Sequence, residues 1–228
     1  MDRFRTLTAF VVFYMLISLM GSGKSYSQLY NGYSINMSYG IFRFGWHTPD
    51  EYLARMYKEP FYQRDIALGT SFELFRNSFQ SVLISANYKF RLLDFEYDKK
   101  NSSGAVIGTN SLGARIHSFQ FSITERLRYH FRHIYLYVYA GPRFDLNAGT
   151  SADDPDFNTF LNGIKPTTIG LSSGAGIGLE FSRFFNMTFE TYFEPDFTKA
   201  YTSSTGYLKS SEFGIRLGFW LVKKSGKK

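Results

Sequence analysis

The chain has 228 residues and a formal net charge of +7, from 26 lysines and arginines against 19 aspartates and glutamates. It contains no cysteine, so no disulfide framework stabilises it. Residues 1–27 contribute +2 of the charge and residues 223–228 contribute +4, which leaves +1 for the body of the chain. A body so close to neutral excludes a nucleic-acid-binding surface.

The N-terminal segment has the pattern of a secretory signal peptide. Arg3 and Arg5 precede an apolar run at 7–20. This run is shorter than the roughly 20 residues that a membrane-spanning helix needs. Small serines occupy positions −3 and −1 before Gln28, where we expect cleavage. The sequence therefore predicts that residues 1–27 are removed on export.

The sequence GSGKS at 21–25 resembles part of a phosphate-binding loop. That motif needs a glycine five positions before its second glycine, because the first glycine allows the turn that aims backbone N–H groups at phosphate. Ser18 stands at this position. We therefore assign GSGKS to the signal peptide rather than to a nucleotide site.

The rest of the chain alternates between apolar and polar residues. In 167–181 the odd positions are mainly apolar, whereas the even positions hold four glycines, hydroxyl residues and one carboxylate. Successive side chains of a strand point to opposite faces, so the pattern predicts a two-faced strand. The same alternation predicts eight strands, at residues 30–45, 65–76, 79–98, 111–128, 133–148, 166–182, 185–199 and 206–222.

Short and long connections alternate along the predicted strands. The short ones lie near 77–78, 129–132 and 183–184, and the long ones lie at 46–64, 99–110, 149–165 and 200–205. Within the strand at 79–98, the alternation slips in phase at Leu92 and Leu93, which predicts a β-bulge.

An even number of antiparallel strands can close into a barrel, either a soluble one with apolar residues inside or a membrane one with apolar residues outside. Glycine placement favours the membrane barrel, because the narrow lumen of eight strands accommodates small residues. The glycines that share the polar face are Gly170, Gly174, Gly176, Gly178, Gly214 and Gly218.

Aromatic residues near the strand ends predict the two girdles of a membrane barrel. Those near the short turns are Tyr129, Phe131, Phe184, Phe185, Phe219 and Trp220, and those near the long loops are Phe95, Tyr97, Tyr201 and Tyr207. We predict an all-β fold: an eight-stranded antiparallel up-and-down transmembrane β-barrel. It spans residues 28–222, after an N-terminal signal peptide at 1–27 and before a lysine-rich periplasmic tail at 223–228.

The whole mature segment resembles the eight-stranded outer-membrane β-barrel families, the OmpA/OmpX-like barrels and the PorT-like "porin family" barrels. The last strand resembles the C-terminal signal that the barrel-assembly machinery reads, with Gly214, Leu217 and Phe219 at its characteristic positions. It departs from that signal because Phe213 replaces the usual polar residue and a lysine-rich tail follows.

The resemblance implies a location in the outer membrane of a diderm bacterium, with the N- and C-termini in the periplasm. It also implies outer-membrane lipid and the barrel-assembly machinery as partners.

Charged residues on the polar face predict a network of ion pairs that fills the lumen, because unpaired charges in a tight interior are costly. An ion path is the alternative interpretation. The residues are Glu73, Lys89, Arg126, Arg143, Asp145, Glu180, Glu190, Glu194, Glu212 and Arg216.

No arrangement of residues in the sequence points to catalysis, a metal or a cofactor. His117 and Ser118 are adjacent, so they face opposite sides of a strand and cannot form a nucleophile–base pair. His47 lies near two carboxylates in the first long loop, which leaves a lipid-modifying enzyme as a remote alternative. The acidic run at 153–156 lacks the ligand spacing of a calcium loop.

The first long loop mixes aromatic and charged residues, as loops that bind partners often do. It either contacts a partner or folds over the mouth of the barrel. The candidate contact residues are Trp46, His47, Tyr52, Arg55, Tyr57, Phe61 and Tyr62.

These features predict a non-enzymatic integral outer-membrane β-barrel protein that acts through its extracellular loops or as a structural envelope component. The PorT-like resemblance implies an alternative, a subunit of an envelope protein-secretion machine whose partners are envelope or secretion proteins. A lipid-modifying outer-membrane enzyme is the third hypothesis.

Overall fold

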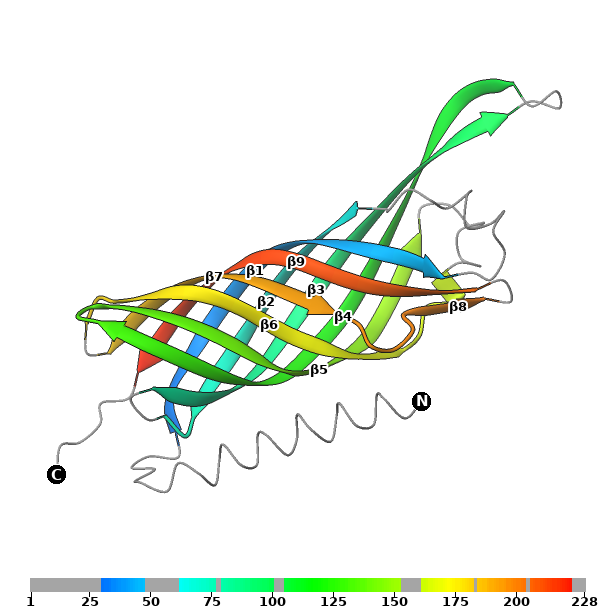
Figure 1. Ribbon diagram of the computed structural model, residues 1–228. Coiled ribbons are helices and arrows are strands. Elements are labelled where there is room, and N and C mark those ends of the chain that lie inside the picture. Colours follow the sequence, from blue (N-terminus) through cyan, green and yellow to red (C-terminus); the bar gives the residue numbers. More distant parts are fainter. Residues whose placement is uncertain are drawn as a thin grey trace.

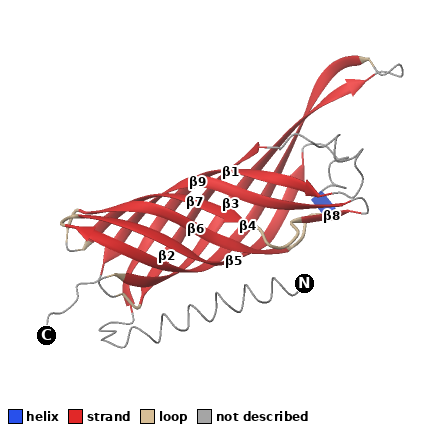
Figure 2. Cartoon of the chain, in the orientation of Figure 1, coloured by secondary structure: helices blue, strands red, loops and turns tan. Residues whose placement is uncertain are grey.

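The computed structural model describes residues 30–47, 62–76, 79–100, 105–152, 161–182, 184–203 and 206–222. Almost all of them lie in strands, which Figure 2 shows in red. The predicted signal peptide and lysine-rich tail lie outside these ranges. Among the described residues, no helix is long and apolar enough to cross a membrane. The strands are β1 (Tyr30–His47), β2 (Tyr62–Leu74), β3 (Gln80–Lys100), β4 (Val106–Phe131), β5 (Ile134–Ala152), β6 (Thr167–Glu180), β7 (Phe185–Pro195), β8 (Tyr201–Ser203) and β9 (Gly206–Val222).

The strands form one closed antiparallel barrel (Figure 1). Strands β1 to β7 pair in chain order, β7 pairs with β9, and β9 pairs with β1 to close the ring. The three-residue β8 pairs with β9 beyond the end of β7, so it continues the seventh strand after a break at 196–200. The wall therefore has eight strands, which confirms the predicted up-and-down architecture.

The predicted strand ends agree with the structure within a few residues, except between β3 and β4. The expected loop at 99–110 is largely strand, because β3 and β4 remain paired as far as Lys100 and Val106. The predicted bulge at Leu92 and Leu93 is also wrong: these residues pair with Arg115 and Ala114 without a register shift.

A small apolar cluster explains why the alternation changes near Leu93. At the end of the barrel that carries the long connections, here called the loop end, the inward-facing side chains become apolar and form a cap. Leu93 belongs to this cap and faces inward, whereas Leu92 faces outward. Two apolar residues therefore follow each other in the sequence, which resembles a phase slip although the side chains still alternate between faces. The buried members of the cap are Phe42, Leu93, Ala114, Ile116, Leu161 and Ala200.

Below the cap, the two faces of the wall are inverted relative to a soluble protein. Large apolar side chains point outward, with Leu68 60% exposed and Phe213 59% exposed. Side chains that point inward are mainly polar or charged, such as the fully buried Lys89 and Asp145. Burying charge while exposing a continuous apolar surface suits a barrel surrounded by hydrocarbon, and it excludes the soluble alternative.

The height of the apolar surface matches a bilayer. On β9 the outward residues from Phe213 to Leu221 are all apolar. Eight steps of about 3.3 Å, on a strand tilted by about 40°, rise about 20 Å along the barrel axis. Outer-membrane barrels carry an apolar band about 25 Å tall.

Tyrosines of β5 lie across glycines of β6 inside the wall. In the strand register Tyr135 pairs with Gly178, Tyr137 with Gly176 and Tyr139 with Gly174. All three tyrosines are buried, and a Cβ added at any of the three glycines would collide with the partner ring. The inward glycines therefore provide the room in which these rings pack.

We predict that Gly176→Val lowers the free energy of unfolding of the barrel by about 1–3 kcal/mol, the usual cost of overpacking. A Cβ at this position would lie 2.6 Å from the Tyr137 hydroxyl oxygen and 2.6 Å from the Phe189 carbonyl oxygen. Urea unfolding in detergent or lipid measures the change. The matched control is Ala175→Val on the exposed outer face, and equal destabilisation by both variants contradicts the packing described here.

Candidate functional site

The lumen centres on the amine of Lys89, which is fully buried. Its Nζ lies 2.7 Å from a carboxylate oxygen of Glu194 and 2.7 Å from one of Glu212, and 3.8 Å from Asp65. Lys89 lies on β3, whereas its two closest partners lie on β7 and β9, so this contact joins strands that are distant in the ring. One lysine thus holds carboxylates from several sides of the wall together.

Toward the loop end, two arginines continue the network. Arg143 lies 3.2 Å from Asp145 and 3.4 Å from Glu194, and it also forms an ion pair with Asp196. Arg91 lies 3.5 Å from Glu212, at the level just below the apolar cap. These contacts fill the lumen between Lys89 and the cap.

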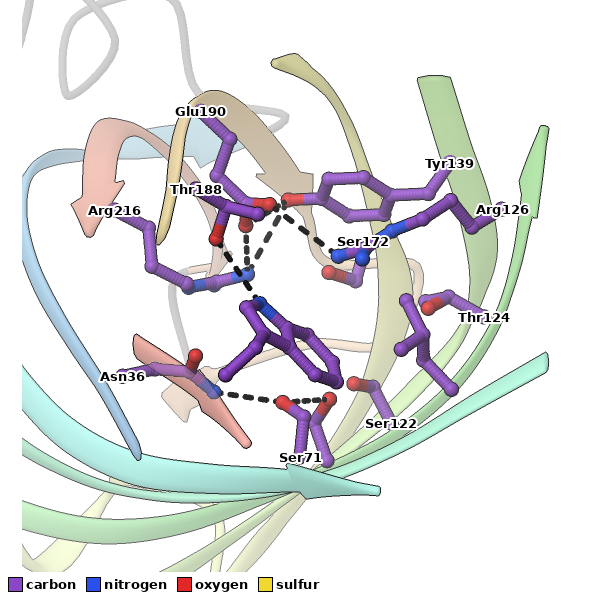
Figure 3. Close-up of a pocket in the computed structure, with 13 residues that line it drawn as sticks. Asn36, Ser71, Ser122, Thr124, Arg126, Tyr139, Ser172, Thr188, Glu190 and Arg216 are labelled. Carbon is purple, nitrogen blue, oxygen red and sulfur yellow. Dashed lines mark hydrogen bonds and ion pairs between the residues drawn. The ribbon is translucent and has the colours of Figure 1, made fainter. Parts of the chain in front are cut away.

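Toward the opposite end, here called the turn end, Glu190 is the hub. It accepts hydrogen bonds from the hydroxyls of Tyr137 and Tyr139, at 2.8 and 3.0 Å. It also lies 2.7 Å from Arg216 and 3.8 Å from Arg126. Figure 3 shows Tyr139, Glu190 and Arg216 converging across the lumen.

Glu73 closes the lumen at the turn end. It pairs with Arg128 and with Arg76, the latter at 3.4 Å, and it accepts a hydrogen bond from Ser81. Glu180 lies at the rim, 3.9 Å from Arg76, and its side chain is 29% exposed. The network therefore runs from the cap to this rim.

The space left between these side chains is small. A lumen cavity of about 20 Å³ lies among Ser71, Ser122, Arg126 and Glu190 (Figure 3). A volume of this size holds about one water molecule. Together with the ion pairs and the apolar cap, it leaves no room for a water column at these levels.

The structure brings every predicted lumen charge into this network, with Glu180 at its rim. Sequence analysis missed Asp65, Arg91, Arg128 and Asp196, which are also buried inside. The alternation contained the signal for the first three, because Asp65 alternates with the outward Ile66, Arg91 follows Lys89 by two residues, and Arg128 follows Arg126 by two residues.

Trp220 corrects the predicted aromatic girdle. Its side chain is only 4% exposed and lies inside the lumen. The indole N–H donates to the Thr188 hydroxyl at 3.1 Å, and the ring lies 5.0 Å from the guanidinium of Arg126. Trp220 lies between the outward residues Phe219 and Leu221, so the alternation places it inward. Its position near the strand end did not predict the face on which it lies. Tyr201 is likewise partly buried against the apolar cap rather than in a girdle.

The predicted assembly signal lies on the strand that closes the barrel. Gly214 is buried against Tyr192, whereas Phe219 points outward. Its recognition by an assembly machinery stays a prediction. Of the candidate contact residues in the first long loop, Trp46 and His47 end β1 and Tyr62 begins β2. Tyr52, Arg55, Tyr57 and Phe61 lie outside the described residues.

His117 and Ser118 point to opposite faces, as the alternation predicts. Ser118 is fully buried in the lumen, while His117 points outward, with its Nδ1 2.5 Å from the Tyr88 hydroxyl oxygen. Within the described ranges, no group of three or more histidines and carboxylates has a geometry that could hold a metal ion. The acidic run at 153–156 lies outside those ranges.

No protein-family profile matches the sequence, and no curated protein matches it either. Solved structures do match in fold. The outer membrane protein OprG from Pseudomonas aeruginosa is 12% identical with a TM-score of 0.48, over 87% of this chain and 98% of that one. The outer membrane protease OmpT from Escherichia coli is 10% identical with a TM-score of 0.45, over 87% and 100%. The Escherichia coli outer membrane protein W is 10% identical with a TM-score of 0.41, over 86% and 100%.

The chain is an eight-stranded transmembrane β-barrel of the outer-membrane type. The strand pairing and the inverted faces carry this assignment. The predicted resemblance to eight-stranded outer-membrane barrels is thereby confirmed, whereas the PorT-like part of it stays a prediction.

We predict that Lys89→Met destabilises the barrel by about 3–5 kcal/mol, because it removes the fully buried cation that lies 2.7 Å from both Glu194 and Glu212 and leaves these carboxylates with less charge compensation. Unfolding in urea, followed by tryptophan fluorescence, measures the change. Adding Glu212→Gln to this variant is expected to restore part of the loss. The control is Lys165→Met at an exposed site, and equal stability of the two single variants contradicts the proposed pairing.

Proposed function

We propose that this protein is a non-enzymatic, non-conducting barrel of the bacterial outer membrane that presents the β3–β4 hairpin to another envelope protein. The filled lumen supports the non-conducting part of this proposal. Lys89, Arg143 and Glu194 are buried and paired across the lumen, and an apolar cap lies above them. Such a barrel serves as a rigid membrane anchor for what its ends display.

The observation that carries the proposal is the length of the hairpin. β2 stops pairing with β3 at Leu92, and β5 stops pairing with β4 at Ala114. Among the described residues, 94–100 and 106–113 therefore pair only with each other. Eight residues of strand extend about 25 Å. Figure 1 shows this hairpin, in green, projecting beyond the rest of the wall.

The two edges of the projecting hairpin differ in chemistry. Along 94–100 the β3 edge carries five charged residues in seven, which is how natural edge strands discourage pairing. Along 106–113 the β4 edge has no charged residue and no proline. An uncharged edge of this length suits the addition of an extended strand from a partner protein.

The proposed orientation places this hairpin outside the cell. Bacterial outer-membrane barrels have short periplasmic turns and longer extracellular loops. Three short turns lie at one end, at 75–79, 132–133 and 181–184, together with the start of β1 and the end of β9. On this basis the N- and C-termini of the barrel lie in the periplasm.

A subunit of an envelope protein-secretion machine is the second candidate function, since the same open edge suits docking to a larger assembly. The alternative in which the barrel acts alone, as a structural envelope component, needs no partner at this edge. A lipid-modifying enzyme gains no support from the described residues, because Ser118 faces the filled lumen and His117 faces outward.

A photo-crosslinking amino acid at Thr109, on the open edge, tests the proposal in native outer membranes. We expect one discrete crosslinked envelope protein, identified by mass spectrometry. The same group at His133, in the β4–β5 turn at the opposite end, is the matched control and is expected to give none of that product.

Replacing residues 95–111 with a short turn provides a second test. The barrel is expected to keep its heat-modifiable migration on gels, because the wall strands end below the deletion, and to lose the partner. A shortened barrel that retains the same co-purifying proteins, or a Thr109 variant that crosslinks only to lipid, contradicts the proposal.

A further inference from the structure

A band of basic residues lies on the outer surface of the wall near the loop end. Arg43 on β1, Arg64 on β2 and Arg115 on β4 are all exposed. Lys209 on β9 is partly exposed and lies next to them along the ring. We call these four residues the basic band.

The strand register places the band members side by side. Arg64 and Arg115 both pair with Leu92 of the strand between them, so their backbones are about 10 Å apart, two interstrand spacings. Arg43 pairs with Tyr62, two residues from Arg64, which gives a diagonal separation of about 7–8 Å. Lys209 pairs with Gly45 and is diagonal to Arg43 in the same way.

Among the side chains that the structure describes, none is an acidic partner of the band. In the described part of the chain, no carboxylate lies within ion-pair distance of the three arginines or of Lys209. The acidic residues Asp94 and Glu96 follow Leu92 along β3 by two and four residues, toward the projecting hairpin.

The band lies at the border of the apolar surface. Toward the turn end, Ile41 and Ile66 lie two residues from Arg43 and Arg64, and all these strands become apolar outside within four residues. The outward residues reached in this way are Ile41, Ile66, Phe119 and Phe213, all exposed and apolar. Among the side chains that the structure describes, the basic residues on the outer face of strands near this border lie on β9, β1, β2 and β4, while the exposed Lys165 and Lys199 lie in connections.

We propose that the basic band binds the phosphate groups of a phosphorylated glycolipid in the membrane leaflet at the loop end. The inference rests on the transmembrane placement and on the proposed orientation, in which this leaflet faces outward. A guanidinium donates two parallel hydrogen bonds to a phosphate, and arginines at the apolar border meet headgroups at their natural depth. The apolar residues below the band then contact the acyl chains of the same lipid.

The test uses the protein purified from membranes in mild detergent, with bis-phosphorylated lipid A and its fully dephosphorylated form as probes. Native mass spectrometry measures the bound lipid. We expect the wild type to prefer the phosphorylated form. Arg43→Gln/Arg64→Gln is expected to weaken this binding at least about tenfold, since each charge-assisted hydrogen bond contributes on that order.

The matched control is Arg132→Gln/Lys165→Gln, which removes the same charge from exposed positions outside the band. It is expected to bind the phosphorylated lipid like the wild type. Heat-modifiable gel migration verifies that each variant is folded, so that a loss of binding is distinct from a loss of the barrel.

Three results overturn the proposal. One is equal weakening by the band and control variants, and another is equal binding of the two lipid forms by the wild type. The third is arginine-dependent binding of a soluble heparin fragment as tight as that of lipid A, which identifies a polyanion outside the membrane as the partner. The crosslinking experiment at Thr109 does not depend on any of these outcomes.

Discussion

The requirement that buried charges be neutralised governs this structure. Among the described residues, the lumen buries seven carboxylates and five cations, and Arg216, with 12% of its side chain exposed, adds a sixth cation. An isolated charge in such an interior costs several kcal/mol, so each ion needs a partner from another strand. Lys89 meets Glu194 and Glu212 in this way, which ties opposite parts of the wall together. The same contacts that stabilise the closed ring also occupy the space that a pore would need.

The inner and outer faces of the barrel wall have different roles. Inside, glycines of β6 leave room for the tyrosine rings of β5, whose hydroxyls donate to Glu190. Outside, apolar side chains match the hydrocarbon, and the basic band lies at its border. With the lumen filled, the chemistry available for function lies at the ends and on the outer surface. The projecting β3–β4 hairpin and the band are the two features there that the architecture of the barrel itself does not explain.

Period-two alternation predicted most of the fold and most of the lumen network. It placed Glu73, Lys89 and Arg143 inside because side chains of a strand must alternate between faces. The alternation was misleading at Leu93, because this inward residue of the cap is itself apolar. Trp220 was assigned to the wrong face because its position near a turn was given more weight than its place in the alternation. The full length of the hairpin was not predicted, since 99–110 lacks clear alternation where no wall lies beside it. The basic band went unnoticed because its members are 21 to 166 residues apart in sequence and meet only through the register.

Because the chain has no native cysteine, single introduced cysteines can test directly whether the lumen is filled and only the outer face contacts lipid. Ser172 donates to Glu194 at 2.9 Å inside the lumen, and its neighbour Ser173 is on the outer face. Single Ser172→Cys and Ser173→Cys variants would be treated in membranes with a water-soluble and a lipid-soluble thiol reagent. We predict that the lipid-soluble reagent labels only the cysteine at 173 and that neither reagent labels the one at 172. Labelling at 172 by the water-soluble reagent would show an open aqueous path and contradict it.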